Sequence, residues 1–210
     1  MKEIFIKYGE LSTKKNNKNY FIKVLKSNIE KSIDNIEVSY DFGRMFIKVL
    51  NNDYDLVIDK LKNIFGIHEI VVCEKYSDKD IDSIKDNVLK NIKGIKFNTF
   101  KVETKRSDKT YSIKSTEVSK VVGGYILKNI PNIKVDVNSP ELLINIEIRN
   151  EEVLIYHDVI RGIGGYPVGT LGKGLLMLSG GIDSPVSGYL AMKRGVKIDA
   201  VYFESPPHTS

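Results

Sequence analysis

The chain has 210 residues, 41% of them hydrophobic, which is enough for one or two domains with a sizeable core. Its longest apolar runs are far shorter than the ~20 residues of a membrane span, and its start, MKEIFIKYGE, meets charged residues too soon for a secretory leader. The single cysteine, Cys73, excludes an internal disulfide framework and a CxxC metal pair. We therefore expect a cytoplasmic protein with no membrane anchor.

The net charge of +5 is unevenly spread along the chain. Residues 1–26 hold seven lysines against two acids, and residues 93–128 hold nine Lys or Arg against three acids. Between them, residues 51–92 hold six lysines against nine acids. Two basic stretches around an acidic one are typical of a surface that binds a polyanion, although a solvated lysine-rich surface gives the same pattern.

Residues 1–75 predict the order βαββαβ, which indicates a ferredoxin-like domain. Asp53 is placed to cap the second helix and Gly66 to end it. The expected elements are strands at 3–8, 36–40, 44–50 and 67–76, and helices at 20–33 and 53–65.

Residues 76–165 predict a second α/β unit. Its second helix carries Gly123–Gly124, which indicates a close approach of another backbone. The expected elements are helices at 77–94 and 115–130, and strands at 96–106, 134–137, 141–150 and 152–160.

The next segment, RGIGGYPVGTLGKG, holds six glycines and one proline between Arg161 and Gly174. That composition predicts a flexible or tightly turned linker, which we place at residues 166–174.

The motif SGGIDS at 179–184 follows a short apolar run, LLML, and opens a helix. Ser184 is placed as the N-cap, Pro185 as the first helical residue, and residues 196–203 as the next strand. A glycine-rich turn between a parallel strand and a helix offers backbone N–H groups to a phosphate. Asp183 would repel that phosphate unless a cation lies between them, which predicts Mg²⁺ beside the nucleotide.

Other phosphate and nucleophile motifs do not fit these residues. GxxxxGK[ST] would need glycine at 167, where the chain has Pro167, and Ser or Thr at 174, where it has Gly174. GxGxxG is absent from the turn, and GxSxG matches no serine of the loop. His68, His157 and His208 show no metal-ligand spacing, so no protein metal site is predicted.

SGGIDSPV at 179–186 resembles the pyrophosphate loop (PP-loop) of the ATP pyrophosphatase superfamily. Further strings narrow the resemblance to the tRNA 4-thiouridine synthetase (tRNA sulfurtransferase) family and extend it over essentially the whole chain. They are IFIKYGEL at 4–11, KVETKRSDKTY at 101–111, GGYPVGT at 164–170 and YFESPPHTS at 202–210.

The resemblance implies three parts of mixed α+β and α/β class. Residues 1–75 would be an N-terminal ferredoxin-like domain, and 76–165 a THUMP RNA-binding domain. Residues 175–210 would be the first βαβ unit of a doubly wound parallel-sheet PP-loop domain. A lone βαβ unit is too small for such a domain, so we expect the chain to be an incomplete piece.

The same resemblance implies the chemistry. ATP would adenylate O4 of a tRNA uridine, and a cysteine persulfide loaded by a cysteine desulfurase would then deliver sulfur, giving 4-thiouridine. A related role lies in thiamine thiazole synthesis, and a homodimer is possible in this family. Asp183 would be the residue needed for adenylation. The ATP contacts would be Met177, Leu178, Ser179, Gly180, Gly181, Asp183, Ser184, Tyr202 and Phe203.

Cys73 lies inside a predicted strand and is interpreted as a small buried hydrophobic residue, so the sulfur-carrying cysteines are expected beyond residue 210. The basic stretches give the expected contacts with tRNA phosphates. The first group is Lys105, Arg106, Lys109 and Lys114, and the second is Lys14, Lys15 and Lys18. Tyr111 is placed either to stack on a base or to lie half-buried at a strand edge.

Two further interpretations stay open. A non-catalytic RNA-binding module with a vestigial nucleotide loop has the same motifs. A pyrophosphatase that acts on a small amidated metabolite would leave both basic modules unexplained.

Overall fold

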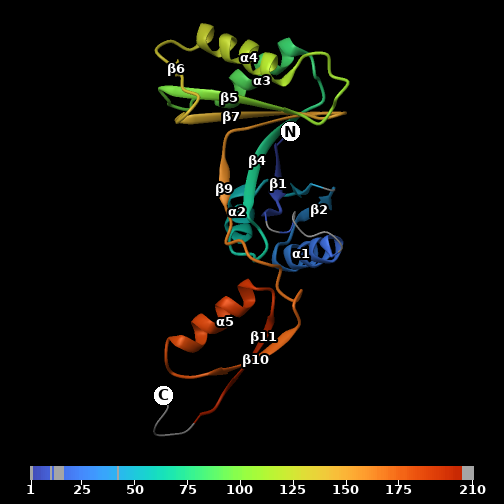
Figure 1. Ribbon diagram of the computed structural model, residues 1–210, viewed down its shortest axis with the longest axis vertical. Coiled ribbons are helices and arrows are strands. Elements are labelled where there is room, and N and C mark those ends of the chain that lie inside the picture. The colour runs from blue at the N-terminus through green and yellow to red at the C-terminus, as the bar shows by residue number, and fades with distance from the viewer. Residues whose placement is uncertain (1, 10, 12–16, 42, 205–210) are drawn as a thin grey trace. The chain divides into compact units, whose positions relative to one another are not determined.

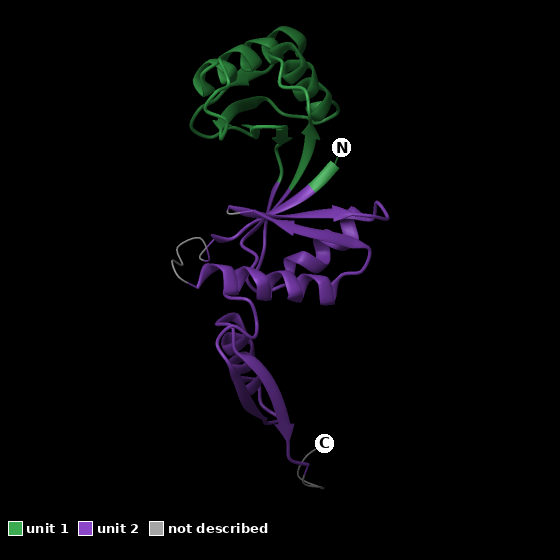
Figure 2. Ribbon diagram, turned by 90° about the vertical axis from the view of Figure 1, so that its right-hand side faces the viewer, with its two compact units in different colours: residues 1–3, 72–158 green, residues 4–71, 159–210 purple. Residues whose placement is uncertain are grey.

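The computed structural model describes residues 2–9, 11, 17–41 and 43–204. The chain forms two compact units, residues 1–3 with 72–158 (unit 1) and residues 4–71 with 159–210 (unit 2), shown in Figure 2. Strand β4 (Glu69–Tyr76) gives its first three residues to unit 2 and its last five to unit 1.

Unit 2 begins with the expected βαββαβ order, labelled in Figure 1. The strand order is β2-β3-β1-β4, and β1, β2 and β3 pair antiparallel, with Ile4 opposite Ile47. The elements are β1 (Lys2–Lys7), α1 (Lys18–Ser32), β2 (Ile36–Tyr40), β3 (Arg44–Val49), α2 (Tyr54–Lys62) and β4.

The apolar residues of these elements form the core of this sheet and its helices. Leu25 and Ile29 of α1 and Leu61 of α2 are fully buried, as the helical spacing of apolar residues predicts. The Asp53 carboxylate accepts a hydrogen bond from the Leu56 N–H at 3.3 Å, so it caps α2 as expected. Helix α2 ends at Lys62, however, and not at Gly66.

Unit 1 has two helices packed on one face of its sheet, as Figure 1 shows for α3 and α4 over β5 and β7. Here β5 pairs parallel with β6 and β7, while β8 pairs antiparallel with β7 and β4. The elements are α3 (Ile81–Ile92), β5 (Thr99–Arg106), α4 (Ser115–Asn129), β6 (Lys134–Val135), β7 (Leu142–Ile148) and β8 (Val153–Tyr156).

The strand expected at 152–160 is two strands. Residues 157–158 leave the extended ladder, and β9 (Val159–Arg161) pairs antiparallel with the first residues of β4 in unit 2. The sequence pattern did not separate them, although the polar residues His157 and Asp158 lie between them, because β9 has only three residues and its pairing with β4 is set by the fold. The sequence analysis assigned residues 159–165 to the α/β unit at 76–165. In the structure they belong instead to unit 2, together with the ferredoxin-like elements.

The C-terminal part of unit 2 is a small βαβ segment in which β10 and β11 pair parallel, with Leu178 opposite Tyr202. Its elements are β10 (Lys173–Leu178), α5 (Asp183–Lys193) and β11 (Lys197–Tyr202). The side chain of Leu176 lies against Gly188 of α5, so the helix covers one face of β10. None of the helices in the described residues is long and apolar enough to cross a membrane.

Candidate functional site

The loop between β10 and α5 is held by its two serines. The Ser179 N–H donates to Ser184 Oγ at 3.1 Å, and the two hydroxyl oxygens lie 3.2 Å apart. The Gly181 N–H donates to Ser179 Oγ at 3.4 Å. The hydroxyls therefore fix a tight turn from the end of the strand to the start of the helix.

Ser184 is not the N-cap that the sequence predicts. Helix α5 begins at Asp183 with Ile182 in the cap position, and no side chain caps it. Pro185 is therefore the third helical residue, still in the turn where a missing N–H costs nothing. The physical reason is that the Ser184 hydroxyl accepts a hydrogen bond from the N–H of Ser179, which lies four residues before the start of the helix.

The two glycines of the loop leave open space. A Cβ atom at Gly180 would meet no atom within 4 Å, and one at Gly181 would meet only Ser179 Oγ at 3.6 Å. Neither residue has a positive φ, so the backbone does not require glycine here. Within the described residues, the N–H groups of Gly180 and Ile182 have no protein acceptor. The loop thus offers unobstructed backbone donors beside a helix N-terminus.

The strand-end residues expected to contact ATP lie at one edge of the sheet. Because β10 and β11 are parallel and in register, Leu178 and Tyr202 are neighbours at their carboxyl ends. Met177 is 67% exposed and Phe203 is also 67% exposed. The structure brings these four residues and the loop to the same edge.

Asp183 is exposed in the first turn of α5. Its carboxylate is the one acidic group of the described loop, and among the described residues no three His, Cys, Asp or Glu side chains form a metal-binding group. One carboxylate beside open N–H donors suits a hydrated Mg²⁺ that is shared with nucleotide phosphates, because Mg²⁺ commonly takes one or two carboxylates plus substrate oxygens.

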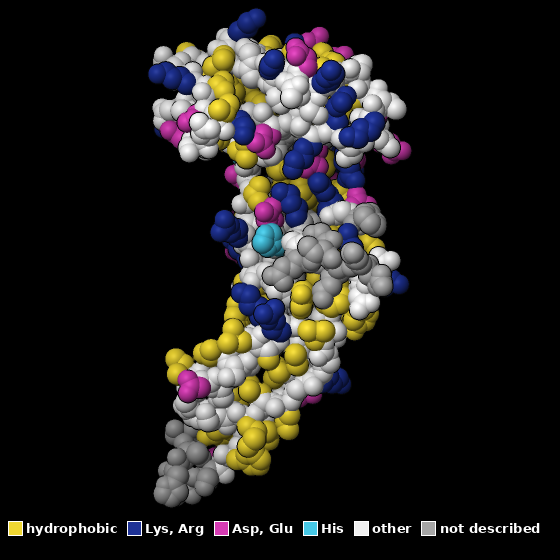
Figure 3. Space-filling model, in the orientation of Figure 1, with side chains coloured by type: hydrophobic (Ala, Val, Ile, Leu, Met, Phe, Trp, Pro, Cys, Tyr) yellow, Lys and Arg dark blue, Asp and Glu magenta, His cyan; other side chains and the backbone are white. Residues whose placement is uncertain are grey.

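The basic residues predicted to contact RNA differ in exposure. Lys105, Lys109 and Lys114 are exposed on unit 1, at the end of β5, in the following loop and just before α4. Figure 3 shows Lys and Arg side chains spread over the displayed face of this unit. Lys18, the first residue of α1, places its Nζ 5.8 Å from the centre of the Tyr8 ring, and Lys14 and Lys15 lie outside the described residues.

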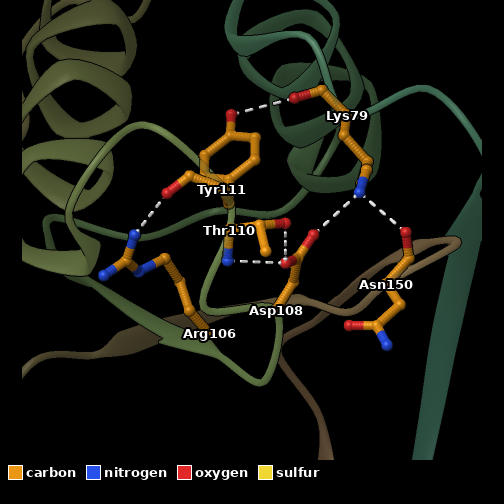
Figure 4. A network of polar contacts seen from close by, with 6 residues as sticks. All are labelled: Lys79, Arg106, Asp108, Thr110, Tyr111 and Asn150. Carbon is orange, nitrogen blue, oxygen red and sulfur yellow. Dashed lines mark hydrogen bonds and ion pairs between the residues drawn. The ribbon is translucent and has the colours of Figure 1, made fainter.

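Arg106 is mainly a structural residue of the loop after β5. Its Nη1 donates to the carbonyl oxygens of Tyr111 at 2.6 Å and of Ile113 at 2.8 Å. Figure 4 shows the guanidinium directed at the loop. Tyr111 is half-buried, and its hydroxyl donates to the Lys79 carbonyl at 2.9 Å, but it lies in the loop between β5 and α4 and not at a strand edge.

Asp108 holds the same loop from its other side (Figure 4). Its carboxylate accepts hydrogen bonds from the Thr110 hydroxyl at 2.6 Å, the Thr110 N–H at 2.9 Å and Lys79 Nζ at 2.9 Å. Hydrogen bonds from Thr110 first, and then from Lys79, hold the pKa of Asp108 far below its ordinary value. Lys109 is thus presented by a loop of fixed shape, next to Lys105 at the end of β5.

A groove between β5 and α4 was missed by the sequence reasoning. Two adjoining hollows of about 340 and 390 Å³ share Val102 and Ser119 in their linings. Contrary to expectation, no backbone packs on Gly123 or Gly124, since a Cβ at either would meet no atom within 4 Å. The paired glycines were the available signal. The groove is lined in part by Lys101, Lys105, Lys120, Val135 and Val137.

Cys73 is buried in β4, only 1% exposed, and its Sγ lies 3.5 Å from the Glu3 carbonyl oxygen. Such a thiol has no access to a substrate in this structure. It behaves as the small buried residue that the sequence indicates.

Family models match the chain in three consecutive segments. Residues 3–71 match the ThiI ferredoxin-like domain, residues 78–158 the THUMP domain, and residues 169–210 the thiamine biosynthesis protein ThiI. The fold class predicted from the sequence is thereby confirmed, with a parallel-strand segment at the C-terminal end.

Curated relatives named probable tRNA sulfurtransferase match nearly all of the chain. The protein of Thermoanaerobacter pseudethanolicus is 46% identical over 210 residues, and that of Streptococcus pneumoniae is 44% identical over 213. Each match covers 99% of this chain but 54% and 52% of the relative, so the chain spans about half the length of these proteins.

Solved structures agree. A 4-thiouridine synthetase in complex with RNA and bound ATP is 38% identical, with a TM-score of 0.86 over 99% of this chain and 54% of that one. The protein PH1313 of Pyrococcus horikoshii is 30% identical, with a TM-score of 0.84 over 98% of this chain and 69% of that one. The chain therefore belongs to the tRNA sulfurtransferase (4-thiouridine synthetase) family.

Proposed function

We propose that this chain is the RNA-binding and nucleotide-loop part of an enzyme that uses ATP to transfer sulfur to a uridine of tRNA. The observation that carries the proposal is the SGGIDS loop. It opens α5 at the carboxyl edge of two parallel strands, with its glycines facing open space. The similar 4-thiouridine synthetase was crystallised with RNA and bound ATP, which supports both halves of the proposal.

In the first step, the loop from Ser179 to Ser184 binds the phosphates of ATP. The backbone N–H groups and the helix N-terminus stabilise negative charge, and Met177, Leu178, Tyr202 and Phe203 border the base and ribose. Asp183 would hold a Mg²⁺ ion, which would shield the charge of the phosphates. O4 of the uridine attacks the α-phosphorus, pyrophosphate leaves, and the oxygen becomes part of a good leaving group, AMP.

In the second step, the terminal sulfur of a cysteine persulfide attacks C4 and AMP departs with O4. A second cysteine thiolate then attacks the S–S bond, which leaves sulfur on the uridine and a disulfide on the enzyme. Cys73 is the single cysteine of this chain and is buried. We therefore assign both sulfur-carrying cysteines to the half of the relatives that this chain does not span, and the persulfide to a cysteine desulfurase.

RNA is bound by unit 1 through the exposed Lys105, Lys109 and Lys114, which contact phosphates. The groove beside β5 and α4 is lined by Lys101 and Lys120 together with apolar side chains, a combination that accommodates unpaired nucleotides. Arg106 acts by shaping the loop that carries these lysines, and Lys18 of α1, with Lys14 and Lys15, contributes a secondary contact.

The description of the family matched by residues 169–210 also names thiamine biosynthesis. We propose that the same sulfur carrier serves thiazole formation. Thiazole formation and tRNA thiolation would then both need the persulfide, and thiazole formation would not need the tRNA-binding surface.

The test uses the natural gene product with tRNA, ATP, Mg²⁺ and a cysteine desulfurase. Nucleoside mass spectrometry should find sulfur in place of one uridine oxygen only when ATP is present. Tight tRNA binding without ATP-dependent sulfur incorporation would contradict the proposal and favour a non-catalytic RNA-binding module.

A further inference from the structure

We propose that residues 164–172, the docking strap, rigidly fix the nucleotide-loop segment to helix α1 and to the loop between α2 and β4, which makes the ferredoxin-like domain a positioning element for the loop. The glycine-rich composition predicts a flexible or a tightly turned linker, and in the structure the segment is turned and hydrogen-bonded on both sides. All contacts that carry the inference lie within unit 2.

The strap is bonded along its length to the C-terminal end of α5 and to the turn that follows. The Tyr166 N–H donates to the Lys193 carbonyl at 2.9 Å. The N–H groups of Gly169 and Leu171 both donate to the Gly195 carbonyl, at 2.9 and 3.0 Å. In a solvated linker these backbone N–H groups would donate to water instead.

The other side of the strap is bonded to the ferredoxin-like part. The Gly66 N–H donates to the Gly164 carbonyl at 2.9 Å, and the Gly164 N–H donates to the Ile67 carbonyl at 2.8 Å. From helix α1, the Asn28 amide donates to the Val168 carbonyl at 3.1 Å. The strap therefore joins both parts of unit 2 through its own backbone.

Aromatic contacts reinforce the same joint. The rings of Phe21 in α1 and Tyr166 in the strap meet edge-to-face, with centroids 5.5 Å apart. The rings of Phe65 and Tyr189 lie 5.2 Å apart and connect the segment after α2 directly to α5. Each such pair adds orientation as well as burial.

Glycines in the joint are required by close packing. A Cβ at Gly165 would overlap the Lys193 carbonyl oxygen, and one at Gly195 would overlap Thr170 Oγ1. A Cβ at Gly66 would lie 2.8 Å from Pro167 Cγ. Within the motif GGYPVG, Gly165 thus gives a close approach to α5, as Gly66 and Gly195 do on either side of the strap, whereas Gly164 and Gly169 have open space beside them.

The consequence for the proposed reaction is geometric. Helix α5 begins at the nucleotide loop and ends at the strap, so a joint that fixes Lys193 and Gly195 also fixes the direction of the loop. Reacting groups held in the correct geometry contribute a large part of a rate enhancement. Asn28, Gly165 and Tyr166 are positioning residues, because none of them lies in the loop that we assign to ATP.

The structural test is hydrogen exchange of the strap amides in the natural gene product. The amides of Tyr166, Gly169 and Leu171 should exchange far more slowly than in an unstructured peptide. Gly165→Ala should accelerate them at least tenfold. Gly164→Ala is the matched control, since Gly164 also has a positive φ, +67°, but its Cβ would meet nothing within 4 Å.

Asn28→Ala provides a milder variant in case Gly165→Ala does not fold. It removes one side-chain hydrogen bond and should accelerate the Gly169 amide about fivefold. Lys23→Ala, an exposed residue of the same helix, should change nothing. Free exchange of the strap amides in the unmodified protein, or equal effects of Gly164→Ala and Gly165→Ala, would overturn the proposal.

The kinetic readout rests on the proposed function. Gly165→Ala and Asn28→Ala should lower kcat for ATP-dependent sulfur transfer while the KM for ATP and the Kd for tRNA stay unchanged. A loss of ATP or tRNA affinity instead of kcat would contradict a positioning role. If the strap amides are protected but the protein transfers no sulfur to tRNA, the structural proposal for the strap is supported and the proposed function is refuted.

Discussion

Unit 1 and the C-terminal segment of unit 2 differ in how they bury their apolar residues. In unit 1, α3, α4 and the strands enclose a continuous core in which Phe100, Ile144 and Ile146 are fully buried. In residues 173–204, Gly188 and Gly195 are the only buried residues, while Leu175 is 70% and Ile182 78% exposed. Figure 3 shows hydrophobic side chains on the displayed surface of this segment.

The difference separates a self-sufficient module from a dependent one. The antiparallel and parallel strands of unit 1 have their own helices, so the surface that we propose for RNA binding rests on a stable scaffold. A parallel pair such as β10 and β11 normally lies covered on both faces. Here α5 covers one face, and the docking strap supplies much of what holds the segment in place.

The largest expected effect is the contrast between a buried and an exposed apolar residue. Phe100→Ala should lower the free energy of unfolding of unit 1 by about 3–5 kcal/mol, because it removes a buried aromatic ring and leaves a cavity. Leu175→Ala should change the free energy of unfolding of unit 2 by less than about 0.5 kcal/mol. Denaturant titration followed by amide exchange measures both, with the β5 and β7 amides reporting on unit 1 and the β10 and β11 amides on unit 2. Equal losses would refute the comparison.

A second contrast separates structure from RNA binding within the basic loop. Arg106→Ala should destabilise unit 1 by about 2 kcal/mol, since charged hydrogen bonds to two carbonyls are lost. Lys105→Ala with Lys109→Ala should leave stability unchanged but weaken tRNA binding and lower its salt slope by about 2.

The matched control for those lysines is Lys90→Ala with Lys93→Ala, an equal change of charge at the other end of the unit. Filter binding at several salt concentrations gives the slopes. A slope that falls equally for both pairs would mean that net charge, and not this loop, determines affinity.

We expect acid to lower the stability of unit 1, because it protonates carboxylates in the loops of that unit. Hydrogen bonds lower the pKa of Asp108, Asp136 and Glu141 in the folded state. A lowered folded pKa stabilises the protein above the unfolded value of about 4, and that stability is lost as the pH falls through the folded pKa. Thermal unfolding should therefore occur at lower temperature below about pH 4, and Asp108→Asn should reduce this pH dependence. A melting temperature independent of pH in that window would contradict the assignment.

The smallest expected effect concerns Glu3, which is 8% exposed. Burial raises its pKa, although Lys75 nearby opposes that shift. A raised folded pKa favours folding at low pH, and this contribution is lost as the pH rises through the folded value. At pH 7 Glu3→Gln should leave stability unchanged or raise it by up to about 0.5 kcal/mol. A clear loss, measured by urea titration, would mean that the charge of Glu3 stabilises unit 1 through Lys75.

Periodic and capping signals predicted most of the fold. The βαββαβ order, the Asp53 cap and the strand–loop–helix around SGGIDS all depend on residues adjacent in sequence, which is why local patterns were sufficient. Boundaries set by tertiary pairing were not predictable, as the division of 152–160 into β8 and β9 illustrates. The roles of Ser184 and of the strap glycines depend on partners elsewhere in the fold, so the local sequence suggested a cap and left a flexible and a tightly turned linker as alternatives.

The candidate sites were predicted as residue types rather than as geometry. The edge formed by Met177, Leu178, Tyr202 and Phe203 follows from parallel pairing, and its role in ATP binding stays a prediction. The groove beside Gly123 was not found, because a sequence does not distinguish glycines that contact a backbone from glycines that leave space. A cytoplasmic location and a homodimer also stay predictions.

The central claim is that the SGGIDS loop activates a tRNA oxygen with ATP. Its most direct test is tRNA-dependent exchange of radioactive pyrophosphate into ATP by the natural gene product. Asp183→Ala should reduce the exchange rate at least ~100-fold. Asp199→Ala, which removes an exposed carboxylate from β11, should leave it unchanged. Equal exchange by the unmodified protein and the Asp183→Ala variant would contradict the account.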